Sequence, residues 1–131
     1  MKLLLEEPGT AGVQAAWRDA GSHAASVSLI VEARAGLAAA RRVGRQTAGQ
    51  HRTAIDALGE LWLEVEGIEL TEGLAFRAGE LAEIFALRGY DAVHLASAEA
   101  IADDDTILIT SDQDLASAAA SLGLVAVVPA A

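Results

Sequence analysis

The sequence predicts an α/β fold in which a parallel sheet is covered by helices on both faces. Helical patterns alternate with short apolar segments of strand length along the chain. One of these segments, residues 106–110, is apolar through its middle without alternation, which is typical of a strand buried on both faces. No repeat, linker or low-complexity segment divides the chain, so a single domain over residues 1–131 is expected.

Glycines, prolines and capping residues divide the chain into elements. Strands are expected at residues 22–27, 65–70, 106–110 and 124–128. Helices are expected at residues 10–21, 28–43, 47–63, 74–87 and 112–122, and residues 2–7 resemble the last turns of another helix. Thr10 and Ser28 are the expected caps of their helices. Gly89 interrupts the helical pattern, so Asp91 falls in the first turn of the next helix.

Composition excludes several function classes. The chain has no cysteine, which excludes disulfides and thiolate metal sites. Aromatic residues make up only 4% of the chain, so platforms for stacking nucleic-acid bases are not expected. No apolar run is long enough to span a membrane, and the N-terminus is too short for a signal peptide. A soluble cytoplasmic protein is therefore expected, with no membrane partner.

Charge is distributed unevenly along the chain. The net charge of -10 alone argues against a nucleic-acid binder. Residues 33–55, however, contain no acid, and they hold the arginines Arg34, Arg41, Arg42, Arg45 and Arg52. This basic segment either meets phosphates or is a solvated helix face whose arginines form ion pairs, and the sequence favours neither.

Carboxylates form the main constellation of candidate functional residues. The chain has no glycine-rich phosphate loop, no zinc-binding H-E-x-x-H and no serine nucleophile motif. Asp112 and Asp114 follow the apolar segment 106–110, and acids at the carboxyl ends of parallel strands lie where such folds bind ligands. Asp91 can instead be a simple helix-dipole partner. Glu32 lies among apolar neighbours, and it either joins the other acids, reaches solvent or pairs with an arginine, Arg34 or Arg41.

Convergence of these acids would favour a metal ion. Carboxylates in one pocket repel each other, and a divalent cation relieves the repulsion. Ligand sets made of oxygen atoms alone select Mg²⁺ or Mn²⁺ over zinc. Such a cluster suits metal-assisted hydrolysis of a phosphodiester. His94, three residues after Asp91, can hydrogen-bond to it and is expected to be a core or supporting histidine, not a ligand.

Over nearly its whole length the chain resembles the PIN-domain ribonucleases, and among them the VapC-type toxins of toxin–antitoxin pairs. The segments that carry the resemblance are KLLLEEPG (2–9), SLIVEAR (28–34), GYDAVHLA (89–96) and TSDQDL (110–115). The resemblance implies a five-stranded parallel sheet, RNA as the substrate, Mg²⁺ or Mn²⁺ as the cofactor, a homodimer and a VapB-type antitoxin.

The resemblance also assigns roles to residues. Glu32, Asp91 and Asp112 match the family's metal-binding acids, and with Asp114 as an auxiliary acid they form the expected catalytic set. Thr110 or Ser111 matches a small hydroxyl residue near the metal or its water. The arginines expected to bind RNA or the antitoxin are Arg34, Arg41, Arg42 and Arg45.

One departure from the family pattern concerns the start of the chain. Family members begin with a strand that ends in an acid, and residues 2–9 match the helix that follows this strand. We therefore expect an N-terminally truncated domain that lacks the central strand and its acid, with two strand edges left unpaired. The alternative function is a catalytically inactive PIN-like domain that acts by binding an antitoxin or another partner.

Overall fold

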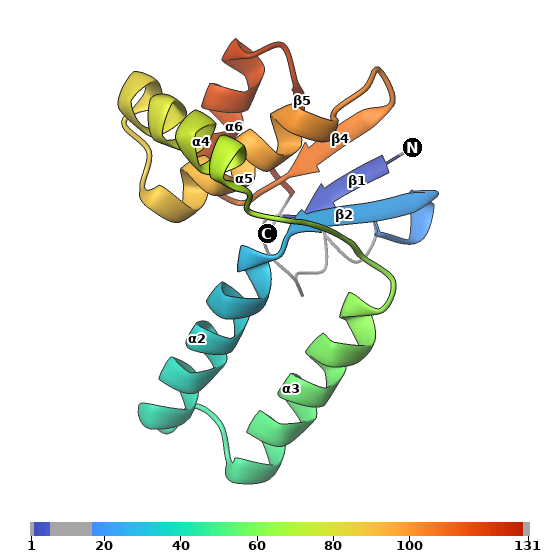
Figure 1. Ribbon diagram of the computed structural model, residues 1–131. Coiled ribbons are helices and arrows are strands. Elements are labelled where there is room, and N and C mark those ends of the chain that lie inside the picture. Colours follow the sequence, from blue (N-terminus) through green and yellow to red (C-terminus); the bar gives the residue numbers. More distant parts are fainter. Residues whose placement is uncertain (1, 6–16, 130–131) are drawn as a thin grey trace.

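The computed structural model describes residues 2–5 and 17–129, which form an open parallel sheet with helices on both sides (Figure 1). The strands are β1 (Lys2–Leu5), β2 (Ser22–Ser26), β3 (Glu66–Ile68), β4 (Thr106–Ile109) and β5 (Val125–Val127), in the spatial order β3-β2-β1-β4-β5. The helices are α2 (Ser28–Arg42), α3 (Ala48–Trp62), α4 (Glu72–Phe85), α5 (Gly89–Ile101) and α6 (Gln113–Ser121), and residues 17–19 are also helical. The predicted α/β class is confirmed.

The start of the chain differs from the prediction. Residues 2–5 are not helical but form β1, which pairs in parallel with β2 on one side and with β4 on the other. The predictions of a missing central strand and of two unpaired edges are therefore wrong. A run of three leucines has no period that separates strand from helix, and pairing here satisfies the backbone groups of both neighbouring strands. β1 itself carries no acid.

The other predicted strands and helices that lie within the described residues are confirmed, although their end residues differ. The predicted cap at Ser28 is wrong. α2 begins at Ser28, but its N-cap is Val27 and no side chain caps it. Ser28 instead directs its hydroxyl toward Ser26 and toward Glu32. The Thr10 cap and most of the helix predicted at residues 10–21 lie outside the described residues.

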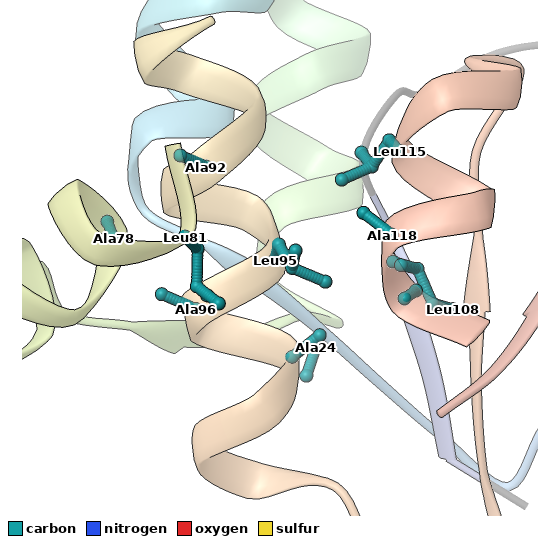
Figure 2. Packing of buried hydrophobic residues seen from close by; sticks show 11 residues of the cluster. Ala24, Ala78, Leu81, Ala92, Leu95, Ala96, Leu108, Leu115 and Ala118 are labelled. Carbon is teal, nitrogen blue, oxygen red and sulfur yellow. The ribbon is translucent and has the colours of Figure 1, made fainter. Parts of the chain in front are cut away.

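Two apolar clusters cover the two faces of the sheet, because successive side chains of a strand point to opposite faces. Ala24 of β2 and Leu108 of β4 belong to the larger cluster, which α4, α5 and α6 complete. Figure 2 shows Leu95 of α5 between Leu81 of α4 and the α6 side chains. The next residues along the same strands, Ala25 and Ile109, face the smaller cluster, whose other buried member is Leu29 and which Trp17, Ala20, Trp62 and Val65 flank.

A helical hairpin of α2 and α3 extends away from the sheet (Figure 1). Gly44, with φ +78°, ends the first helix, and Thr47 caps the second through a reciprocal capping box with Gln50. The basic segment lies on this hairpin. No helix within the described residues is long and apolar enough to cross a membrane.

Candidate metal centre

Three of the predicted acids lie at or near the starts of helices, at the carboxyl edge of the sheet. Glu32 lies in the second turn of α2, directly after β2, and Asp112 follows β4. Asp91 lies in the first turn of α5, where the helix dipole favours a negative charge. This is the edge where parallel α/β sheets place their ligands.

Asp91 is a buried carboxylate, with 4% of the residue exposed. Its Oδ2 accepts a hydrogen bond from Arg88 Nε at 2.9 Å. Arg88 is the N-cap residue of α5, so the interaction spans the first turn of the helix. A carboxylate removed from water in this way requires a cationic or hydrogen-bonding partner, and Arg88 supplies one.

Asp112 is the N-cap residue of α6. Its Oδ1 accepts hydrogen bonds from the backbone N–H groups of Asp114 and Leu115, at 2.9 and 3.2 Å. Its own backbone N–H donates to Thr110 Oγ1 at 3.0 Å. One carboxylate oxygen of Asp112 thus stabilises the helix start, and Oδ2 faces Arg88, whose Nη2 lies 3.7 Å away.

The Arg88 guanidinium therefore faces both Asp91 and Asp112. Its side chain is 83% exposed, whereas those of the two aspartates are 6% and 28% exposed. Sequence reasoning assigned no role to Arg88. Its position three residues before Asp91 is the spacing at which helical ion pairs form, and this was the available signal.

Glu32 interacts with a different residue. Its Oε2 lies 2.5 Å from His94 Nε2 on α5, and because a carboxylate only accepts, the ring N–H is the donor. Ser28 Oγ also donates to Glu32 Oε2, at 3.5 Å. His94 is buried and bonds to Glu32 and not to Asp91, so the predicted His94–Asp91 hydrogen bond is wrong. The ion pair of Glu32 with Arg34 or Arg41, one of the alternatives from the sequence, does not form.

The remaining predicted site residues differ in exposure. Thr110 is fully buried and accepts the hydrogen bond from Asp112. Ser111, which precedes α6, and Asp114, in the first turn of α6, are exposed. The four arginines proposed for RNA or partner binding are exposed on the hairpin, and Arg42 lies ten residues beyond Glu32 along α2, about 15 Å along the helix axis.

The donor chemistry of these residues fits a hard divalent cation, but the acids do not form one cluster. Among the described residues, no three acidic or histidine side chains lie close enough to hold one metal ion. The Arg88 guanidinium contacts both Asp91 and Asp112. A positive charge can therefore lie between the two carboxylates, which come from two different helices. Glu32 bonds to His94 beside them on α5. The pair of aspartates thus fits a metal as a two-carboxylate core.

Beyond this geometry, comparison with known proteins defines the family. The fold and its acids are those of an α/β domain that places ligands beyond the carboxyl ends of its strands. The model of the family described as PIN domain matches residues 1–121, and the chain belongs to this family.

Named relatives agree with this assignment. The chain is 36% identical over 123 residues to "Ribonuclease VapC45" of Mycobacterium tuberculosis, which covers 94% of this chain and 85% of the relative. Among solved structures, PAE2754 from Pyrobaculum aerophilum has a TM-score of 0.72 at 19% identity, covering 95% of this chain and 88% of that one. VapBC2 from Rickettsia felis, bound to a DNA fragment from its promoter, has a TM-score of 0.65 at 15% identity, covering 99% and 100%.

Proposed function

We propose that the chain is a metal-dependent endoribonuclease of the VapC type, the toxin of a toxin–antitoxin pair. The observation that carries the proposal is the buried Asp91 carboxylate, which faces the same cation as Asp112 at the carboxyl edge of the sheet. Ribonuclease VapC45 is similar over 94% of the chain, which supports RNA as the substrate class.

In this proposal Asp91 and Asp112 hold Mg²⁺ or Mn²⁺ as a two-carboxylate core, and Glu32, which bonds to His94 beside them, is the proposed third acid. When bound, the metal activates water and stabilises charge on the phosphodiester. Two neighbouring residues position the acids. Thr110 fixes the backbone at Asp112, and His94 fixes the orientation of the Glu32 carboxylate. Asp114, on the first turn of α6, adds negative charge to this edge as an auxiliary acid, with Ser111 beside it.

The proposed partners are a VapB-type antitoxin, a second copy of the chain and RNA, in the cytoplasm. A groove of about 590 Å³ between α2 and α3 supports an antitoxin contact, because Ile30, Leu58 and Leu63 line it together with Arg34. VapBC2 of Rickettsia felis, a similar fold, was solved with its promoter DNA.

Exposed Phe76 and Ile84 on α4, at 70% and 65% exposure, support a contact between two copies. Arg41, Arg42 and Arg45, also on the hairpin, would bind RNA or the antitoxin.

Cleavage of RNA by the chain with Mn²⁺, with EDTA and by the Asp91→Asn variant tests the enzyme proposal. We expect cleavage with Mn²⁺, and none with EDTA or in the variant. Asp104→Asn is the matched control, because it makes the same chemical change on the loop before β4, at the opposite edge of the sheet. Cleavage by Asp91→Asn at the wild-type rate would refute the assignment.

A second candidate function is a catalytically inactive PIN domain that acts by binding. It is favoured by the absence of a three-ligand cluster among residues 2–5 and 17–129. A folded chain that shows no Mn²⁺-dependent cleavage, but still binds an antitoxin, would support this candidate against the enzyme.

A further inference from the structure

We propose that the Arg88 guanidinium and the divalent cation compete for the same two carboxylates, so that metal binding displaces Arg88 from Asp91 and Asp112. The inference rests on the metal site of the proposed function. It assigns to Arg88 a positioning role, in which this residue holds the two acids in place until the metal replaces it.

The first argument concerns which oxygen atoms are available. Asp112 Oδ1 already accepts two backbone hydrogen bonds at the start of α6. The other oxygen, Oδ2, is the atom that faces Arg88 Nη2 at 3.7 Å. Asp91 likewise faces Arg88 through its Oδ2, at 2.9 Å. A cation shared by these two oxygens lies between them, in the space that the guanidinium spans.

The second argument concerns charge. A divalent cation binds carboxylate oxygens at about 2.0 to 2.2 Å, so it would lie within a few Å of a guanidinium that kept both contacts. A divalent ion and a guanidinium a few Å apart repel each other, because a protein surface screens charges less than bulk water does. Simultaneous occupation is therefore strongly disfavoured, and binding of one cation releases the other.

The third argument concerns the ease of release. The Arg88 side chain is 83% exposed, so the guanidinium stays in contact with water whether or not it faces the two acids. Its backbone holds the N-cap position of α5 without a side-chain cap bond, so the side chain can rotate without breaking the helix. Asp91, in contrast, is buried on α5, and its carboxylate can bind either the Arg88 guanidinium or the metal ion without moving.

Competition predicts a gain in metal affinity when Arg88 is removed. Titration calorimetry with Mn²⁺ should give a dissociation constant about threefold to tenfold lower for Arg88→Gln than for the wild type, the range that a partly exposed charged pair supports. Arg88→Lys should fall between them, because one ammonium cannot reach both acids as a planar fork does. Arg52→Gln, which removes the same charge from the exposed start of α3, is the matched control and should leave the constant unchanged.

A direct readout of displacement comes from the wild-type protein. The Arg88 Nε–H signal in a nitrogen–hydrogen NMR spectrum, identified by its loss in Arg88→Lys, should shift or exchange-broaden as Mg²⁺ is added. An unchanged signal at saturating Mg²⁺ would overturn the competition, even if Arg88→Gln fails to fold. Equal Mn²⁺ affinity in wild type and Arg88→Gln would also overturn it while leaving the metal site standing. Absence of Mn²⁺ binding in both proteins would overturn the metal site and the competition together.

Discussion

Replacing Asp112 by alanine and by asparagine separates its observed role as the cap of α6 from its proposed role as a metal ligand. The cap consists of two hydrogen bonds from backbone N–H groups to Oδ1. Losing an aspartate cap to alanine costs about 1 kcal/mol of folding free energy. The ion pair with Arg88 adds little, because its N···O distance is 3.7 Å and the arginine is 83% exposed.

Asparagine keeps the cap, since its side-chain oxygen accepts the same hydrogen bonds and the two residues rank together at this position. It loses only the interaction of the charge with the helix dipole, roughly a few tenths of a kcal/mol. For a domain of this size, the difference between the two variants corresponds to a melting temperature about 3 to 5 °C lower for Asp112→Ala than for Asp112→Asn.

Thermal unfolding by circular dichroism in EDTA measures the cap, and RNA cleavage with Mn²⁺ measures the ligand role. We expect both variants to lose cleavage and only Asp112→Ala to lose the full cap contribution. Equal melting temperatures would refute the capping argument. Cleavage retained by Asp112→Asn would show that the carboxylate charge is not needed, and the metal assignment of this residue would fall.

Three further predictions address the core, pH and assembly. Leu95→Ala should lower the free energy of unfolding by about 3 kcal/mol in denaturant titration, because Leu95 is fully buried within the larger cluster; a loss below about 1 kcal/mol would contradict this packing. Arg77 hydrogen bonds lower the pKa of Glu99, so the ion pair stabilises the fold above the unfolded-state pKa of about 4.3 and is lost as pH falls through the lower folded-state pKa. Glu99→Gln should therefore lose less stability than wild type between pH 6 and pH 3, and identical pH profiles would contradict the pairing. Phe76→Glu should convert the proposed dimer to a monomer in light scattering, and an unchanged mass would exclude α4 as the contact.

Much of the fold was predictable because its signals are local. The apolar β4 segment and Gly44, which ends α2, each reflect a rule that acts within a few residues. Asp112 was predictable for the same reason, because it directly follows a strand and begins a helix.

The interactions missed by the sequence interpretation depend on tertiary structure. Glu32 and His94 are 62 positions apart, and only the packing of α5 near the start of α2 brings them together. The three leucines of β1 carry no period that distinguishes strand from helix, and their pairing between β2 and β4 decides their conformation. Arg88 showed a helical spacing to Asp91, but its approach to Asp112 depends on how α6 lies beside α5.

The position of β1 in the middle of the sheet has a consequence for the order in which the chain folds. Leu5 pairs with Ile109, so the middle of the sheet joins two residues that are 104 positions apart in the sequence. Such long-range pairing forms slowly, whereas the α2–α3 hairpin needs only neighbouring residues. During synthesis the hairpin can therefore form while the sheet stays open, and Asp91 and Asp112 can both face Arg88 only after β4 has left the ribosome. Ribosome-bound chains that end before residue 106 should therefore show hairpin helicity without cleaving RNA.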